Sequence, residues 1–94
     1  MKTIKAIKLA NYGAVLTGRD FGKEILSQIL KEYDGPYALD FSDVLSMGSS
    51  FGEELIPKLA EKQDKKIKII KASSPIKSCL KDIENEIKVT LTFV

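Results

Sequence analysis

The 94-residue sequence contains no histidine and a single cysteine, Cys79, and these absences exclude several kinds of chemistry. The common zinc sites need histidine or several cysteines, so one copy of this chain cannot assemble them. Serine–histidine–aspartate and cysteine–histidine catalysis are excluded because both need a histidine base. Cys79 has no partner for an intrachain disulfide, which favours a reducing compartment. We therefore expect no metal, no cofactor and no enzymatic activity.

Long apolar runs and arginine are also scarce. No run approaches the ~18 apolar residues of a membrane span, and no signal-peptide core follows the charged start Met1–Lys5. We expect a cytoplasmic protein that does not enter a membrane. The chain has 15 basic and 13 acidic residues, a net charge of +2, and Arg19 is its only arginine. Proteins that bind nucleic acid commonly use several arginines, whose guanidinium groups form paired hydrogen bonds with phosphates and bases. With one arginine, this chain is not expected to have a nucleic-acid partner.

The remaining composition is that of an ordinary globular protein, and the length fits one domain, residues 1–94. Strand and helix patterns alternate, which predicts an α/β fold with a mixed sheet of four to five strands and about three helices. The expected strands are Thr3–Leu9 with a bulge near Ala6 and Ile7, Ala14–Leu16 returning as a hairpin, Tyr37–Phe41, Lys66–Ile70 and Lys88–Val94.

Three segments carry apolar residues at helical spacing. The first, Thr17–Tyr33, is expected to be capped by Thr17 or Asp20 and to end at Asp34-Gly35-Pro36. For the second helix, Ser50 and Glu53 match the capping-box pattern. The third is expected to have Ser74 as N-cap and Pro75 as its first residue.

The segment from Tyr37 to Leu55 carries the main candidate for function, because it places Ser49 and Ser50 at a helix start directly after a strand. A phosphate is tolerated at such a position, since the first amides of a helix are unpaired and the dipole is positive there. Phosphorylation adds about −1.5 to −2 charges, enough to eject an apolar or acidic partner. The simpler alternative is that both serines only cap the helix.

The same residues resemble the STAS domains of anti-sigma-factor antagonists, and more closely the short STAS-like proteins. The resemblance rests on Leu39-Asp40-Phe41-Ser42, on Met47-Gly48-Ser49-Ser50-Phe51-Gly52-Glu53-Glu54-Leu55 and on Gly18-Arg19-Asp20-Phe21-Gly22. It implies a bacterial signalling protein that docks on a histidine-kinase-like ATPase or another signalling protein. The serine that a partner kinase phosphorylates in the antagonists falls on Ser49, with Ser50 as second choice. The residues expected to contact the partner are Asp40, Asp43, Gly48, Phe51, Glu53 and Glu54.

Two other functions stay open. We expect the protein to be a monomer or weak homodimer. A constitutive adaptor would use an exposed edge strand at the C-terminal end instead of phosphorylation. A small enzyme or ligand binder would need Arg19, Asp40 and Asp43 to converge near the carboxyl ends of the strands. The glycine spacing of Gly13–Asp20 is similar to a phosphate-binding loop, but arginine and aspartate replace the required lysine and hydroxyl residue, which favours a plain turn.

Overall fold

The computed structural model describes residues 4–94, and within them it contains six strands and three α-helices. A short 3₁₀ turn, Leu9–Asn11, follows the first strand. In chain order the elements are β1 (Lys5–Lys8), β2 (Val15–Leu16), α1 (Arg19–Glu32), β3 (Tyr37–Asp40), β4 (Ser46–Met47), α2 (Ser49–Glu61), β5 (Lys66–Ile70), α3 (Ser74–Ile87) and β6 (Thr90–Phe93).

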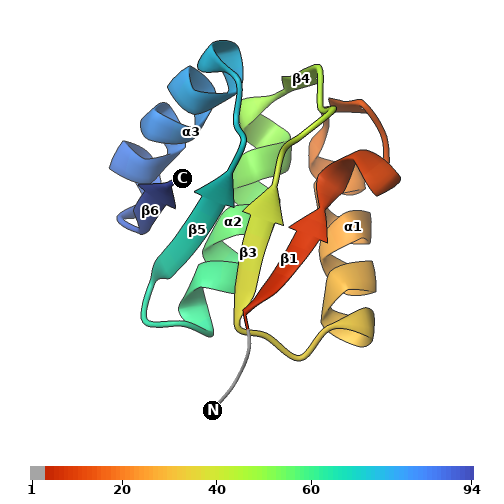
Figure 1. Ribbon diagram of the computed structural model, residues 1–94, viewed down its shortest axis with the longest axis vertical. Helices are drawn as coiled ribbons and strands as arrows, with labels where there is room; N and C mark the ends of the chain where they lie inside the picture. Colours follow the sequence, from red (N-terminus) through yellow and green to blue (C-terminus); the bar gives the residue numbers. More distant parts are fainter. Residues whose placement is uncertain (1–3) are drawn as a thin grey trace.

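The main sheet has the strand order β1-β3-β5-β6, and each neighbouring pair is parallel. The chain crosses this sheet in one direction only, and right-handed crossovers then place every connecting helix on the same face. Accordingly, α1, α2 and α3 all lie behind the sheet (Figure 1). The expected α/β fold is confirmed, with four strands in the main sheet and parallel pairing where a mixed sheet was expected.

The core fills the space between the sheet and the helices. Ile7, Leu39 and Ile69 stand in register on three adjacent strands, and each side chain is 1% exposed or less. Burial of an aliphatic side chain of this size contributes about 1.5–3 kcal/mol to folding. The apolar stripes predicted for the helices supply the opposite side of the core, with Ile25, Ile29, Leu55, Ile56, Leu59, Ile76, Leu80 and Ile83 buried.

β1 is a regular strand, so the expected bulge near Ala6 and Ile7 is wrong. Its residues pair one to one with those of β3. The strict alternation of apolar residues that a strand shows is broken for another reason. Ile7 faces the helices and Ala6 lies on the opposite face, whereas Leu9 belongs to the 3₁₀ turn and not to the strand. Thr3, where we expected the strand to begin, lies outside the described residues.

β2 does not return as a hairpin. It pairs in parallel with β4, Val15 opposite Ser46 and Leu16 opposite Met47, and the two form a small separate sheet. From the sequence, the residues of β4 were expected to belong to a loop. The pairing matters because β2 leads directly into α1 and β4 leads directly into α2, so it holds the starts of two helices side by side.

The helix starts differ by a residue or two from those predicted, and none has a side-chain cap. α1 begins after Gly18, whose φ of 93° suits glycine, so neither Thr17 nor Asp20 is its N-cap. In α3, Ser74 is the first helical residue and Ser73 is the N-cap. The serines and threonine near these starts therefore do not perform the capping role that their residue type suggested.

The helices α1 and α2 approach closely at Gly22. A methyl group on Gly22 would lie 2.9 Å from the carbonyl oxygen of Phe51 and 3.0 Å from Cβ of Glu54. Because these atoms are on or next to the backbone, α2 would have to shift. Gly52 is different, since a methyl group there would meet Cδ1 of Ile83, at 2.5 Å, which is the end of a flexible side chain.

We predict that Gly22→Ala lowers the free energy of unfolding by about 1–3 kcal/mol, the usual cost of overpacking. Both variants gain about 1 kcal/mol of helix propensity, but Gly52→Ala costs less because the end of the Ile83 side chain can move aside, whereas the Phe51 backbone cannot. Urea unfolding measures both, with the exposed Ser27→Ala on α1 as control. A Gly22→Ala protein as stable as wild type would contradict the close helix contact.

The side chain of Gln63 connects the starts of β3 and β5 through hydrogen bonds to backbone groups of both strands. Its Oε1 accepts a hydrogen bond from the amide of Tyr37 at 2.5 Å. Its Nε2 donates to the carbonyl oxygens of Tyr37, at 3.0 Å, and of Lys66, at 2.8 Å. The side chain thereby links the backbone of Tyr37 to that of Lys66 at this end of the sheet.

We expect Gln63→Ala to lower the free energy of unfolding by about 1–3 kcal/mol, because it leaves part-buried backbone groups of Tyr37 without partners. Lys62→Ala, at an exposed neighbouring position, is the matched control and should change stability by less than about 0.5 kcal/mol. Thermal and urea unfolding of the two variants compare them. Equal stabilities would mean that the Gln63 bonds contribute nothing net.

Candidate functional site

Ser49 and Ser50 lie where a strand passes into a helix, as the sequence predicted. Gly48 follows β4 and is the N-cap of α2, and Ser49 and Ser50 are the first two helical residues. Ser49 is exposed and Ser50 is half-buried. The Gly48 amide donates to the carbonyl of Leu16 at 2.8 Å, which fixes the start of α2 against β2. The hydroxyl of Ser49 is therefore held at a defined place on the surface.

The capping box expected from Ser50 and Glu53 does not form. The N-cap is Gly48, which has no side chain, and no side-chain cap satisfies the first turn of α2. Ser50 lies two residues beyond the N-cap position, inside the helix. The positive end of the helix dipole is thus left without a side-chain acceptor, and this is the electrostatic condition that tolerates a phosphate on Ser49.

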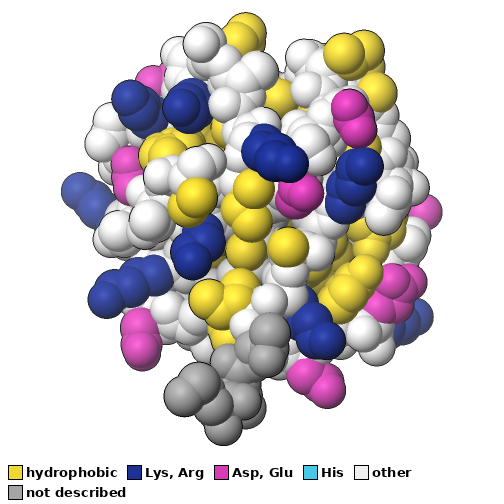
Figure 2. All heavy atoms as spheres, viewed as in Figure 1, with side chains coloured by type: hydrophobic (Ala, Val, Ile, Leu, Met, Phe, Trp, Pro, Cys, Tyr) yellow, Lys and Arg dark blue, Asp and Glu magenta, His cyan; other side chains and the backbone are white. Residues whose placement is uncertain are grey.

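Exposed apolar side chains lie next to the serines. Val15 on β2 is 54% exposed, and Leu45, just before β4, is 74% exposed. The Leu45 amide donates to the carbonyl of Ala14 at 2.8 Å, so the two segments lie side by side. Figure 2 shows hydrophobic side chains along this upper edge of the molecule, over β2 and β4. We call the surface made by Val15, Leu45, Gly48, Ser49 and Ser50 the serine edge.

Arg19 pairs with the acids of α2. Its Nη1 lies 2.6 Å from Oε1 of Glu54, and its Nη2 lies 3.7 Å from Oε2 of Glu53. The bond to Glu54 raises the pKa of the guanidinium above its ordinary value. Glu53 also forms a side-chain hydrogen bond with Glu86, and this bond raises the pKa of the Glu86 carboxyl above its ordinary value. The two acids expected to meet a partner are thus engaged within the chain, and Arg19 offsets part of the negative charge that they place near Ser49.

The expectation for Phe51 needs correction. Its side chain is 0% exposed, and its ring centroid lies 5.6 Å from that of Phe21. Phe51 is therefore a core residue between α1 and α2, and its side chain cannot contact a partner docked on this surface. Phe51 lies on the apolar stripe of α2 with Leu55 and Leu59, and this stripe determines its role.

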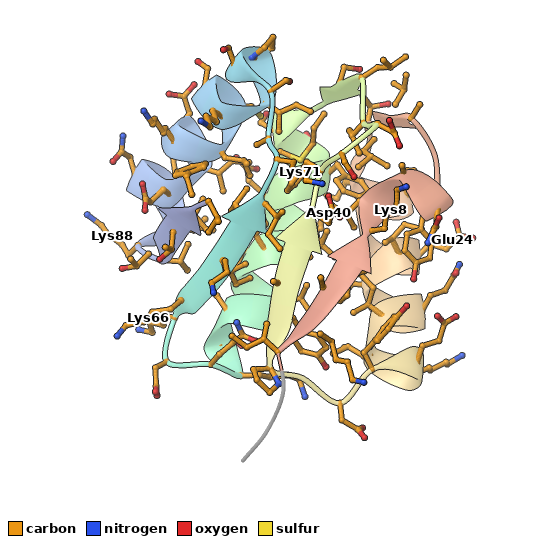
Figure 3. All side chains as sticks on the ribbon, viewed as in Figure 1. Lys8, Glu24, Asp40, Lys66, Lys71 and Lys88 are labelled. Carbon is orange, nitrogen blue, oxygen red and sulfur yellow. The ribbon has the colours of Figure 1, made fainter. Side chains whose placement is uncertain are left out.

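Asp40 and Asp43 lie at the end of β3 and just after it, and make contacts of their own. Oδ1 of Asp40 accepts from the amide of Ser42 at 2.8 Å, and this bond lowers the pKa of the carboxyl, helped by Lys71 and Lys8. In Figure 3 the side chain of Lys71 points towards Asp40. Asp43 has a positive φ of 66° and pairs with Lys8 at 3.4 Å. The aspartates and Arg19 thus have separate partners and do not form one site.

The cysteine and a surface hollow lie outside the serine edge. Burial raises the pKa of the half-buried Cys79 thiol above its ordinary value, so the thiol is a poor nucleophile. No group of acids and cysteine within residues 4–94 has the arrangement to hold a metal ion, and no helix there is long and apolar enough to cross a membrane. A hollow of about 300 Å³ at the far end of the sheet is lined by Asp34, Gly35, Pro36, Tyr37, Lys62 and Gln63.

Val15 and Leu45 were not predicted from the sequence as part of a site. Val15 precedes the buried Leu16 and Leu45 follows the buried Val44, and two adjacent apolar residues show no periodicity that would separate the exposed one from the buried one. One sequence signal could have identified Leu45 as a site residue. It lies in the loop between a predicted strand and a predicted helix, and residues of such loops lie at the surface and often take part in binding.

The comparisons with known proteins identify the fold family. No curated protein and no solved structure gave a match to the chain. A family model described as a STAS-like domain of unknown function (DUF4325) matches residues 18–77, from the N-cap of α1 into the first turn of α3. The matched segment includes the serine edge from Leu45 to Ser50 and the Arg19–Glu54 pair. With well over half of its residues matched, the chain belongs to the family of STAS-like domains.

Proposed function

We propose that this chain is a non-enzymatic regulatory domain of the bacterial cytoplasm that docks on a signalling protein through the serine edge. The observation that carries the proposal is the exposed hydroxyl of Ser49 beside the exposed side chains of Leu45 and Val15. Apolar side chains supply the energy of a protein contact, and a hydroxyl among them gives a place where the contact can be switched.

The proposed partner is a histidine-kinase-like ATPase or a related signalling protein. The basis is the resemblance to anti-sigma-factor antagonists, in which the partner kinase phosphorylates the serine at the start of the second helix. In that arrangement ATP is bound by the partner. The loop at Gly13–Asp20 has no role in phosphate binding here, because Arg19 is paired with Glu54 and Glu53.

A phosphate on Ser49 would change the serine edge in a defined way. It would add about −1.5 to −2 charges next to the apolar contact. Glu53 lies four residues further along α2, on the same side of the helix as Ser49, and would repel it. Arg19 is the cation within reach of that cluster. Phosphorylation would therefore both oppose burial against an apolar partner and compete with Glu53 for Arg19.

An adaptor that works by adding a strand to β6 is less well supported. The Leu91 amide on this edge strand donates to Oε2 of Glu84 at 2.7 Å. An added strand would have to displace this bond before pairing with the edge, so Glu84 protects β6 in the way that charged side chains protect other sheet edges. A constitutive adaptor without phosphorylation would therefore also use the serine edge.

The first prediction concerns the switch. Protein purified from its native host should contain a species heavier by one phosphate, mapped to Ser49 by peptide mass spectrometry. Ser49→Asp should weaken binding to the co-purifying partner at least about tenfold, because it puts charge into an apolar contact. Ser27→Asp on the exposed side of α1 is the control. Absence of the phosphorylated species under all growth conditions, together with normal binding by Ser49→Asp, would remove the switch.

The second prediction separates docking from phosphorylation. Leu45→Ser should weaken binding to the same partner about tenfold while changing the free energy of unfolding by less than about 0.5 kcal/mol, since the side chain is already exposed. Leu30→Ser on α1, at the other exposed leucine, should leave binding unchanged. Calorimetry with the purified partner measures both. If Leu45→Ser binds as wild type, the serine edge is not the docking surface.

A further inference from the structure

The face of the main sheet opposite the helices carries a pattern of side chains that the proposed function does not use. Its rows across the strands are Ala6–Ala38–Lys68–Thr92 and Lys8–Asp40–Ile70, with Lys66 beside them. We call this surface the open face. It is separate from the serine edge, so a role for the open face does not depend on the proposed function.

The open face is unusual for a parallel sheet. Such sheets are almost always covered on both sides, because their central strands are apolar on both faces. Here Ala38 on β3 is 1% exposed and Ile70 on β5 is half-buried, yet no helix lies over them within residues 4–94. Figure 2 shows apolar side chains down the middle of this face with lysines on both sides of them. Neighbouring side chains already cover Ala38, whereas Ala6 is exposed and its small side chain lets a helix approach closely.

The charge of the open face is strongly unbalanced. Its cations are Lys8, Lys66, Lys68 and Lys71, whereas its acid is Asp40, and Lys8 pairs with the neighbouring Asp43. Neither Lys66 nor Lys68 forms an ion pair with another of the residues 4–94. Asp40 already accepts a hydrogen bond from Ser42. A partner that covers this face must therefore bring negative charge.

This imbalance distinguishes between the possible occupants. A second copy stacked face to face would bring the two sets of lysines together, which costs energy. Nucleic acid supplies negative charge, but these rows contain no aromatic side chain for base stacking and no arginine for base reading. A helix remains, which is also the element that normally completes a parallel sheet.

The spacing fits a helix with acids on its edges. Lys66 and Lys68 are two residues apart on β5, about 6.6 Å along the strand. Acidic residues four apart on a helix are separated by about 6 Å. A helix that lies along β5 with an apolar stripe on Ala6 and Ile70 can therefore place successive acids beside successive lysines.

We propose that the open face binds an acidic amphipathic helix of a partner protein, which completes an α/β/α arrangement of layers. The apolar stripe of that helix packs on Ala6 and Ile70. Its acidic residues pair with Lys66 and Lys68.

Photo-crosslinking tests the proposal. A benzophenone amino acid replaces Thr92, an exposed open-face residue on β6, and in a control protein it replaces Ser27 on α1. Each protein is irradiated in extract of the native host, and the crosslinked segment is sequenced by mass spectrometry. The expected product from position 92 is a segment with acids three or four residues apart and an apolar stripe. A second copy of this chain, nucleic acid, a segment without that pattern, or a yield no higher than from position 27 would each overturn the proposal.

A charge-reversed variant gives the quantitative test with a synthetic peptide of the crosslinked segment. Lys68→Glu should weaken binding of the peptide about fivefold or more, since it turns an attraction into a repulsion. Lys81→Glu, exposed on α3, makes the same change of net charge away from the open face and should leave binding unchanged. Equal losses for the two variants would mean that only overall charge attracts the peptide, and the specific site would be rejected.

Discussion

The structure depends on one topological constraint: each crossover between parallel strands advances across the sheet in the same direction. Because such crossovers share one hand, the three helices of residues 4–94 collect on a single face. The apolar stripes of the helices and one face of each strand then close a single core. The same constraint leaves the opposite face of the sheet without a cover and brings the starts of all three helices to the edge where the strands end.

That edge is where the chemistry of the chain lies. β2 and β4 each contribute only two residues, yet their pairing sets the starts of α1 and α2 side by side. Gly22 lets the helices approach until the Phe51 backbone is in contact, and Arg19 then reaches Glu54 and Glu53. The result is a surface in which an exposed hydroxyl, exposed apolar side chains and a cluster of paired charges lie together. Each of these features alone is common, whereas their combination at one helix start is what supports a docking role.

Much of the fold could be predicted from the sequence because the signals were strong and local. Helical stripes and the Gly35-Pro36 stop located α1, and the position of Asp40 at the end of a central strand was read correctly from its alternation with Leu39 and Phe41. The pairing of β2 with β4 could not be predicted, because two residues carry no period and their partner lies beyond the whole of α1 and β3. The N-caps were predicted at the wrong residues because serine and threonine favour the N-cap by only about 1 kcal/mol over poor capping residues. Tertiary packing at the start of a helix can outweigh a free energy of that size.

The candidate site was predicted in part for the same reasons. The strand-to-helix junction at Ser49 follows from local pattern, so its exposure could be anticipated. The burial of Phe51 and the engagement of Glu53 and Glu54 by Arg19 depend on how α1 packs on α2, which no local pattern encodes. Leu45 and Val15 are exposed because the pairing of β2 with β4 holds them at the edge of the molecule, where they do not contact the core.

Hydrogen exchange of the chain, alone and in complex with its purified partner, tests most directly whether the serine edge is the docking surface. We predict slower exchange in the complex for amides of residues 14–16 and 45–51, with little change on the outer surfaces of α1 and α3. Protection confined to those outer surfaces, with the serine edge exchanging as in the free chain, would contradict a docking role for it.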